Sequence, residues 1–321
     1  MSRTITRRAA LAAGLSTLAT PAITQTVRFP TRPIEIVVGF VPGGGTDLDA
    51  RAYASFLEKR LGGTVVVVNR PGAGGEGALG QVARARPDGH TLGTTNMPGL
   101  LTIPIERQAQ FKLDDFAPIG NLVTDPSAIS CHEDSPWRSL GDVIEEAKRR
   151  PDTITYASPG VGTDDHLQLV LLQAATGTRF SHVAFQGDAQ QRTALLGKQV
   201  DLIGLNLGPV TANPDKIRVL SQGGATRSRF RRDVPTLREL GYPVEMASER
   251  GIVAPAGTPP AILAQLREAT ADIGKDPEFI RILESRFTEP QIEIGDAWFA
   301  RLRATESRYR ELWARTPWSG R

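Results

Sequence analysis

The sequence predicts an α/β protein with two lobes, and three features carry that prediction. Strand-like runs rich in β-branched residues alternate with segments whose apolar residues recur at helical spacing. Three glycine-rich turns each stand between such a strand and such a helix, and two stretches have the mixed character of connections between lobes. Repeated strand-then-helix units are typical of mostly parallel sheets. A chain of 321 residues is long enough for two domains of ordinary size.

The first strand and the turn after it are the most informative part of the chain. A strand is expected within residues 33–40, and the turn 42–47 (Pro-Gly-Gly-Gly-Thr-Asp) follows directly. A helix then begins, with Leu48, Ala52 and Phe56 near helical spacing. Glycines bring backbone N–H groups close to a ligand, and the first turn of a helix attracts a carboxylate or phosphate. The alternative is a tight turn with Thr46 as the N-cap and no ligand.

The remaining elements follow in order along the chain. The continuous β-branched run 65–68 is typical of a strand buried on both faces. Further strands are expected at 90–94, 120–123, 128–130, 153–157, 182–185, 200–203 and 217–220. Helices are expected at 78–86, 140–149, 166–175, 189–196, 261–273 and 277–285, and a long C-terminal helix carries Trp298, Leu302, Tyr309 and Trp313 on one face.

The second glycine-rich turn spans residues 69–77 and raises the question of a dinucleotide. Gly72, Gly74 and Gly77 satisfy the G-x-G-x-x-G pattern. However, the turn follows the second strand instead of the first, and Met97 stands where an acidic residue would bind the ribose. No P-loop sequence occurs either. We therefore expect no nucleotide cofactor.

The third glycine-rich turn leads from a strand ending at Ala157 into the next helix. Ser158 and Thr163 offer hydroxyl groups, and the backbone from Gly162 onward offers N–H groups to a second anionic group. The alternative is a helix start with Thr163 as N-cap and no ligand. The two acids 164 and 165 disfavour an anion at this end and leave room for an amino group.

Two stretches, residues 116–131 and 244–255, are expected to pass between the lobes. One lobe then comprises residues 27–125 and 251–321, and the other comprises residues 126–250. A discontinuous lobe around a continuous one is the arrangement of a binding protein that closes about a hinge.

Residues 1–25 are predicted to be an export signal. Arg7 and Arg8 precede a short, weakly apolar stretch, and the adjacent arginines indicate twin-arginine export. That stretch is too short to span a bilayer, and no later run reaches 18 apolar residues, so we expect a periplasmic protein that is not embedded in the membrane. Without this segment 35 basic side chains face 35 acidic ones, which argues against nucleic acid as a partner.

The residues offer little for catalysis or metal binding. Cys131 is the only cysteine, so no disulfide and no Cys-x-x-Cys site can form within the chain. The four histidines are scattered, and only His166 lies near a candidate site, where packing against the helix start explains it. The chain has neither a G-x-S-x-G elbow nor a His-Glu-x-x-His helix. We expect no enzyme and no metal; the alternative is an exported α/β enzyme acting on an anionic substrate.

Taken together, these segments resemble the periplasmic receptors of tripartite tricarboxylate transporters, the Bug-type proteins. The likeness spans nearly the whole chain after the export signal. It rests on residues 30–34 (PTRPI), 42–47 (PGGGTD), 50–51 (AR), 69–75 (NRPGAGG), 86–92 (RPDGHTL), 157–163 (ASPGVGT), 166–167 (HL), 199–201 (QVD), 234–241 (VPTLRELG) and 254–259 (APAGTP).

The resemblance implies a type II periplasmic-binding fold whose two lobes close on a small carboxylated molecule. One carboxylate is held by backbone N–H groups of the first glycine turn, and the opposite lobe contributes the third turn and the turn at 186–188. Residues 184–187 and 249–251 differ from the family's usual Pro-Tyr-Lys-Gly and Trp-Gly, so the ligand stays open. Arg250 is either a clamp for a distal carboxylate or part of an ion pair with Glu249 or a neighbour. The residues expected at the ligand are Gly43, Gly44, Gly45, Thr46, Asp47, Ser158, Gly162, Thr163, Asp188 and Arg250.

We therefore expect an exported solute-binding receptor, monomeric, that delivers its ligand to membrane transporter subunits. A sensor in place of the transporter is the alternative partner. The ligand is a di- or tricarboxylate, an amino acid or an aromatic acid. Replacing Gly44 by Val is expected to block the ligand or to force the turn away from positive φ.

Overall fold

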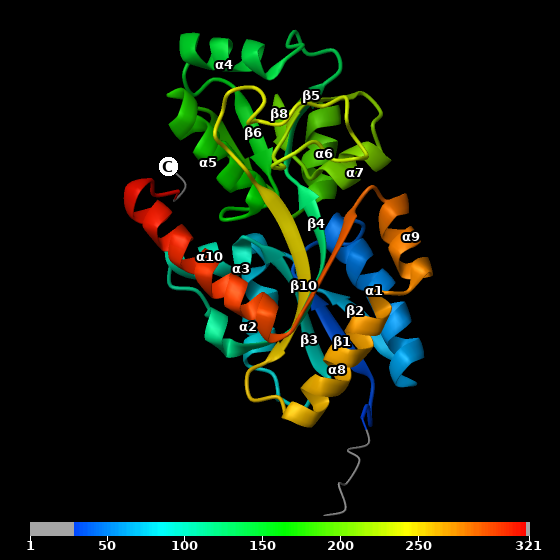
Figure 1. Ribbon diagram of the computed structural model, residues 1–321. Helices are drawn as coiled ribbons and strands as arrows, with labels where there is room; N and C mark the ends of the chain where they lie inside the picture. Colours follow the sequence, from blue (N-terminus) through cyan, green and yellow to red (C-terminus); the bar gives the residue numbers. More distant parts are fainter. Residues whose placement is uncertain (1–28, 319–321) are drawn as a thin grey trace, which may run out of the picture.

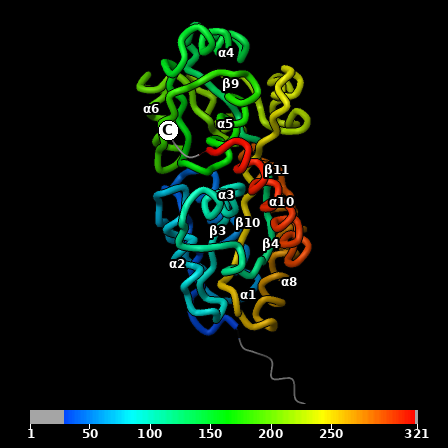
Figure 2. Tube along the Cα trace, turned by 90° about the vertical axis from the view of Figure 1, so that its left-hand side faces the viewer, coloured from blue at the N-terminus to red at the C-terminus, as the bar shows by residue number. Residues whose placement is uncertain are grey.

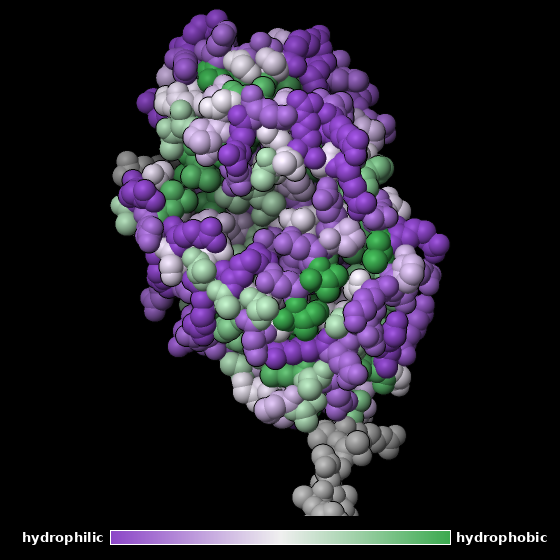
Figure 3. Space-filling view, in the orientation of Figure 1, coloured by the Kyte–Doolittle hydropathy of each residue, from purple (hydrophilic) through white to green (hydrophobic). Residues whose placement is uncertain are grey.

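The computed structural model describes residues 29–318, so the predicted export signal lies outside the described residues. Two β-sheets form a lower and an upper lobe, and β4 (Phe116–Pro126) and β10 (Ala247–Pro255) run from one to the other (Figure 1). Figure 2 shows the same two lobes stacked along the long axis of the molecule. Figure 3 shows a face whose surface is mostly hydrophilic over both lobes.

The lower lobe is built on a six-stranded sheet in the order β11-β4-β10-β3-β1-β2. One core lies on each face of this sheet: α1, α8 and α9 pack on one face, and α2, α3 and α10 on the other. The remaining strands of this sheet are β1 (Ile34–Val38), β2 (Val65–Asn69), β3 (Thr91–Met97) and β11 (Glu289–Ile294). The helices are α1 (Gly45–Leu61), η1 (Ala73–Gly75), α2 (Glu76–Ala83), α3 (Gly99–Glu106), η2 (Leu113–Asp115), α8 (Pro260–Ile273), α9 (Pro277–Ser285) and α10 (Asp296–Arg315).

The upper lobe is built on a five-stranded sheet in the order β7-β6-β8-β5-β9. Apolar side chains of this sheet pack against α4 and α5 in one core and against α6 and α7 in another. The strands are β5 (Ala128–His132), β6 (Thr155–Ser158), β7 (Ser181–Ala184), β8 (Leu202–Gly204) and β9 (Ile217–Gln222). The helices are α4 (Leu140–Arg149), α5 (Asp164–Thr176), α6 (Asp188–Leu196) and α7 (Leu207–Ala212).

The sheets are mixed, which corrects the expectation of mostly parallel sheets. Among the described strands four pairings are parallel and five are antiparallel. Two of the antiparallel pairings arise from the connection between the lobes, because β10 returns from the upper lobe along β4 over nine residues and lies antiparallel to β4 and to β3. The other three are the pairings of β11 with β4 and of β5 with β8 and β9. The strand-then-helix repeat predicts the parallel pairings of β1, β2, β3 and of β6, β7, β8 correctly.

The prediction that the run 65–68 is buried on both faces is wrong. β2 is the edge strand of its sheet, and Val66 is 45% exposed. A continuous β-branched run favours a strand, but its burial depends on its place in the sheet. Among the helices of residues 29–318, none is both long and apolar enough to cross a bilayer.

Candidate ligand-binding site

The first glycine turn leads directly from β1 into α1. Gly44 is the N-cap and α1 begins at Gly45, so the expectation of Thr46 as N-cap is wrong. The expectation of a positive φ at Gly44 is also wrong, since φ is −78° at Gly44 and 89° at Gly43. The hydroxyl of Thr46 accepts a hydrogen bond from Asn96 Nδ2 at 3.4 Å. A helix N-cap of glycine leaves the N–H groups of the first turn without a side-chain partner from the cap itself.

Asp47 braces this turn from the protein side. Its carboxylate accepts hydrogen bonds from the Gly43 N–H at 2.9 Å, from Arg51 Nε at 3.0 Å and from Asn69 Nδ2 at 2.8 Å. Burial raises the pKa of Asp47, but the hydrogen bonds from Arg51, Gly43 and Asn69 outweigh burial, so the net pKa is lowered. Asp47 is therefore an ionised support of the turn, with three donors already bound.

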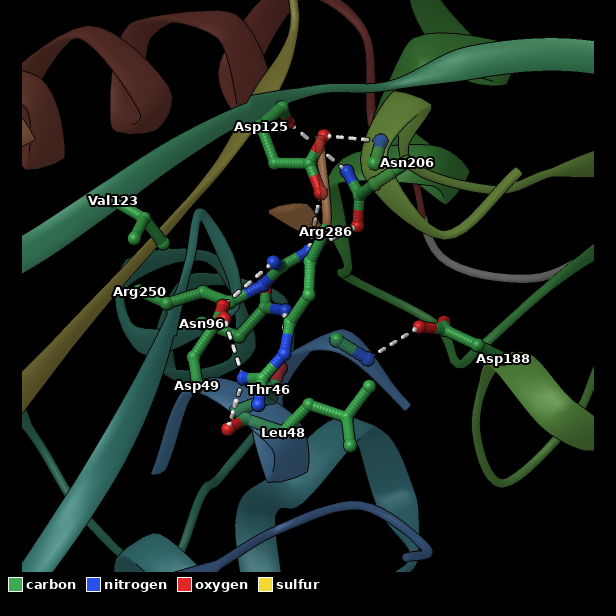
Figure 4. A network of polar contacts seen from close by, with 12 residues as sticks. Thr46, Leu48, Asp49, Asn96, Val123, Asp125, Asp188, Asn206, Arg250 and Arg286 are labelled. Carbon is green, nitrogen blue, oxygen red and sulfur yellow. Dashed lines mark hydrogen bonds and ion pairs between the residues drawn. The ribbon is translucent and has the colours of Figure 1, made fainter. Parts of the chain in front are cut away.

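Asp188 reaches the start of α1 from the opposite lobe. Its Oδ2 atom accepts a hydrogen bond from the Gly45 N–H at 3.2 Å (Figure 4). The side chain belongs to the first residue of α6, so a carboxylate of the upper lobe already stands at the positive end of a helix of the lower lobe. Burial raises the pKa of Asp188, against the opposing effects of Arg250 and the Gly45 N–H. The start of α1 is thus in contact with a carboxylate of the protein itself, contributed by the opposite lobe.

The third glycine turn uses its polar groups to hold its own shape. Ser158 Oγ lies 2.7 Å from His182 Nε2, and Thr163 Oγ1 donates to the Gly160 carbonyl at 2.7 Å. Thr163 is the N-cap of α5, as one interpretation predicted, although its hydroxyl makes no cap bond to the helix. The Gly162 N–H donates to His166 Nδ1 at 3.1 Å. These bonds fix the turn against the start of α5.

His166 and His182 form a neutral pair behind this turn. Their rings are stacked with centroids 4.3 Å apart. Burial, together with the neighbouring His182, lowers the pKa of His166 to about 3, and burial lowers the pKa of His182 to about 4. The expected packing of His166 against the helix start is what the structure shows, because Nδ1 acts as an acceptor for the turn.

The second and third glycine turns meet between the lobes, a contact that sequence reasoning missed. A Cβ atom on Gly160 would lie 3.0 Å from the Cα of Gly74, so only glycine permits this approach. Thr102 Oγ1, on α3, donates to the Gly162 carbonyl at 2.5 Å across the same contact. Of the three glycines that match the dinucleotide pattern, Gly74 makes this contact between the lobes, whereas a Cβ atom on Gly72 or Gly77 would meet nothing within 4 Å.

Arg250 lies buried at the centre of a network that joins both lobes. Its Nη1 donates to Asp49 Oδ2 at 3.0 Å, and its Nη2 donates to Asp125 Oδ2 at 3.0 Å and to Asn206 Oδ1 at 2.9 Å (Figure 4). This arrangement corresponds to the ion-pair alternative, with Asp49 and Asp125 as partners. Glu249 pairs with Arg301 instead, at 2.8 Å.

Asp49, Asp125 and Asn206 were not singled out from the sequence. Asp49 stands on α1, Asp125 near the end of β4, and Asn206 is the N-cap of α7. Burial raises the pKa of Asp125 to about 7, although Arg250 and the Gly208 N–H oppose the rise. Asp125 lies where β4 leaves the lower lobe. Its place in the predicted crossing 116–131 is the one feature of the sequence that indicates a role between the lobes. Within residues 29–318 no cluster of three or more His, Cys, Asp or Glu side chains has the geometry to hold a metal ion.

Comparison with known proteins identifies the family. Residues 50–302 match the model of the tripartite tricarboxylate transporter family receptor. The UPF0065 protein in the gbd 5′ region of Cupriavidus necator is 35% identical over 286 residues, covering 88% of this chain and 86% of that protein. Protein BugT of Bordetella pertussis is 31% identical over 274 residues, covering 84% of each chain.

Solved structures agree with the sequence relatives. The periplasmic binding protein BugD superposes with a TM-score of 0.85 at 30% identity, covering 90% of this chain and 98% of that chain. MatC of Rhodopseudomonas palustris with bound malate gives 0.82 at 25% identity, covering 88% and 99%. A second R. palustris protein, with adipate, gives 0.81 at 28% identity, covering 90% and 97%. The predicted two-lobed periplasmic-binding fold is confirmed, and the chain belongs to the tripartite tricarboxylate transporter receptor family, which includes the Bug proteins.

Proposed function

We propose that this protein is an exported receptor that captures a small carboxylated molecule between its lobes and delivers it to membrane transporter subunits. The observation that carries the proposal is the Asp188 carboxylate on the Gly45 N–H, because it marks the start of α1 as a place where a carboxylate binds between the lobes. The proteins solved with malate and adipate, which share this fold, support the same ligand class.

The ligand site consists of the predicted residues, with roles that follow from their contacts. The ligand carboxylate takes the place of Asp188 on the Gly45 N–H and also binds the N–H groups of Gly44 and Thr46, while Gly43 and Asp47 hold the turn in shape. The third turn forms the wall in the upper lobe, with Gly162 in its backbone and with Ser158 and Thr163 holding its shape from behind. Asp188 contacts the first turn at the Gly45 N–H, and Arg250 pairs with Asp125. Through these two contacts, binding of the ligand affects how the lobes meet.

Closure occurs about β4 and β10. We assign residues 27–125 and 251–321 to one lobe and residues 126–250 to the other. Within residues 29–318 the chain passes from one sheet to the other only twice, along β4 and along β10. A ligand that contacts both lobes stabilises the closed state and shifts the equilibrium toward it. The export signal at 1–25 directs the chain to the periplasm, where it acts as a monomer after cleavage.

Binding accounts for the site better than catalysis does. Ser158 and His182 form a hydrogen-bonded pair of the kind that activates a serine. However, Ser158 is fully buried and also contacts Gly160 through its hydroxyl, so a substrate has no access to it. The pair serves the shape of the turn.

A thermal-shift screen tests the proposal. The mature chain from residue 26 is mixed with mono-, di- and tricarboxylates, amino acids and aromatic acids. A ligand that binds only the folded state must raise the melting temperature with concentration. We expect one class of carboxylate to do so, and Gly44→Val, whose Cβ would meet only Asp188 at ordinary contact distance, to lose the shift. A shift with an ester or a nucleotide, and with none of the acids, would overturn the receptor proposal.

A further inference from the structure

Asp188 occupies the place that we assign to the ligand carboxylate. Its Oδ2 atom accepts a hydrogen bond from the Gly45 N–H at 3.2 Å, and a Cβ atom on Gly44 would lie 3.4 Å from the same oxygen. The carboxylate therefore covers the backbone at the start of α1, at the positive end of that helix (Figure 4). Two ionised carboxylates on one N–H group repel each other at close range, so a ligand and Asp188 exclude each other there.

The turn before α6 places Asp188 at the start of α1. At Gly187 φ is 145°, in the region that favours glycine, and a Cβ atom there would lie 3.1 Å from Cγ2 of Val41. Val41 directly precedes the first glycine turn, so the backbone of the upper lobe lies against the lower lobe at this point. Asp188 is the next residue, and a single methylene joins its Cα to its carboxyl group. The backbone therefore sets where the carboxylate lies.

The first glycine turn keeps its shape without help from Asp188. Asp47, on α1 itself, accepts hydrogen bonds from the Gly43 N–H, from Arg51 and from Asn69. The bond from Gly45 to Asp188 is 3.2 Å long, whereas charge-assisted bonds are typically about 2.7–2.9 Å. Asp188 is also partly exposed, so its carboxylate can turn to water when it leaves the helix start. Another carboxylate can therefore replace it without disturbing the turn.

We propose that Asp188 is an internal competitor of the ligand, which binds the start of α1, links the two lobes there and is displaced when the ligand binds. The proposal rests on the proposed receptor function and concerns the regulation of the same site. A ligand binds only those molecules in which Asp188 has left the Gly45 N–H, so every carboxylate loses affinity by the same factor. When the ligand departs, the return of Asp188 to the helix start opposes rebinding and so favours release of the ligand.

The alternative is that Asp188 stays in place and contacts the bound ligand, and the surrounding charges argue against it. An ionised Asp188 beside a bound carboxylate would repel that carboxylate. Arg250 is the buried cation of this region, but it is already paired with two carboxylates, Asp49 and Asp125. It does not neutralise two further ones. Displacement of Asp188 removes the repulsion, because only one carboxylate then remains at the start of α1.

Thr102 offers a matched control because it forms another hydrogen bond between the lobes. Its Oγ1 atom, on α3, donates to the Gly162 carbonyl of the third glycine turn at 2.5 Å. A carboxylate on the Gly45 N–H leaves this bond in place, so the bond stabilises the closed protein with and without ligand. Its loss should weaken ligand binding or leave it unchanged, because binding must then also close the lobes. Loss of the Asp188 carboxylate should have the opposite effect and strengthen binding.

The test compares the parent protein with Asp188→Ala and Thr102→Val. Isothermal titration calorimetry measures the dissociation constants of benzoate, succinate, glutarate and citrate, which differ in the number of their carboxylates. We expect Asp188→Ala to bind each of these acids that binds the parent protein more tightly, by about fivefold or more and by the same factor for all. Thr102→Val should bind none of them more tightly. If Asp188→Ala fails to fold, Asp188→Ser replaces it, since it also removes the carboxylate.

The charge of the ligands separates competition from simple repulsion. Removal of a repelling charge would favour citrate more than benzoate, because the interaction grows with the charge of the ligand. A gain that rises in that order, or a gain of the same size in Thr102→Val, would overturn the proposal. Unchanged or weaker binding by Asp188→Ala would also overturn it and would leave the receptor proposal standing. Binding of none of the four acids by the parent protein or the variants would contradict both proposals.

Discussion

At the scale of single residues, the fold depends on charges that are buried and paired. Arg250 is 2% exposed and donates to two carboxylates from different elements, Asp49 and Asp125. Replacing Arg250 by Met leaves both carboxylates buried without their cation. Loss of one partner from such a network costs about 3–5 kcal/mol, because the remaining charges stay desolvated. We expect a loss of that size in the free energy of unfolding, measured by urea denaturation.

The matched control is Arg227→Met. Arg227 pairs with Glu239 at 2.8 Å, but both side chains are exposed to solvent. Exposed pairs contribute roughly 0–1 kcal/mol, so this variant should stay close to the parent protein. Equal losses in the two variants would show that the Arg250 network does not stabilise the fold.

The pH dependence of stability belongs to the same scale. Burial, with the neighbouring His182, lowers the pKa of His166 to about 3, below the ordinary value of 6.5. Between these values the unfolded chain binds a proton at this residue and the folded protein does not. The contribution of His166 is therefore fully present above pH 6.5 and is lost as the pH falls toward 3. The pKa of Asp125 is raised to about 7, so its effect on stability has the opposite dependence on pH. The effect of His166 must therefore be measured as a difference between the parent protein and a His166 variant.

His166→Asn isolates the effect, because the amide oxygen can accept from the Gly162 N–H in place of Nδ1. The variant lacks the proton uptake of the unfolded histidine. Relative to the parent protein it should gain about 2 kcal/mol as the pH falls from 7 to 5. Urea denaturation of both proteins at several pH values measures this difference. A difference independent of pH would mean that His166 titrates alike in the folded and unfolded states.

At the scale of elements, the start of α1 is fixed by what lies against its backbone. A Cβ atom on Gly45 would lie 2.9 Å from three atoms of the Arg250 guanidinium, which its own partners hold in place. Gly45→Ala should therefore destabilise the protein by about 1–3 kcal/mol, as overpacking does. Gly77→Ala on α2 is the control, since a Cβ there meets nothing within 4 Å and should gain up to about 1 kcal/mol. Chemical denaturation measures the free energy of unfolding of both variants. A gain in stability for both would show that the close approach of Gly45 to Arg250 does not constrain residue 45.

Elements with local signals are the ones that the sequence predicts well. The bounds of α4 and α9 agree with the prediction, because a capping box of Ser139 and Asp142 starts α4, and Asp276 caps α9 just before a proline. The helices α3 and α7 were missed, since each is short and contains a proline that interrupts the helical pattern.

The candidate site divides in the same way. The glycine turns are local features, and their places between strand and helix were predicted. The meeting of Asp49, Asp125 and Asn206 at Arg250 brings together residues up to 201 positions apart, and no pattern along the chain indicates it. The identity of the partners therefore had to come from the structure.

At the scale of the whole molecule, the end of α10 ties the lobes together beside the glycine turns. α10 begins in the lower lobe and ends against the upper lobe in both views (Figures 1 and 2). Trp318, just after the helix, is buried in a cluster with Leu167 of α5 and with Met246. A cavity of about 550 Å³ lies beside α5 and is lined in part by residues 315–318. Figure 3 shows apolar side chains gathered in this region.

Trp318 should therefore stabilise the closed arrangement of the lobes more than either lobe alone. Trp318→Ala removes a buried side chain from the contact between α10 and α5, and losses of about 3–5 kcal/mol are typical for such truncations. If part of that free energy belongs to closure, the ligand-free variant opens, and its radius of gyration in small-angle X-ray scattering exceeds that of the parent protein.

A bound ligand should restore the smaller radius of gyration of the Trp318→Ala variant. The apparent affinity of the variant should be weaker, because part of the binding free energy now closes the lobes. Leu140→Ala, inside the upper lobe, is the control: it lowers the free energy of unfolding by about 2–5 kcal/mol and leaves the radius unchanged. Equal radii for Trp318→Ala and the parent protein without ligand would show that the C-terminal contact stabilises the fold and has no part in closure.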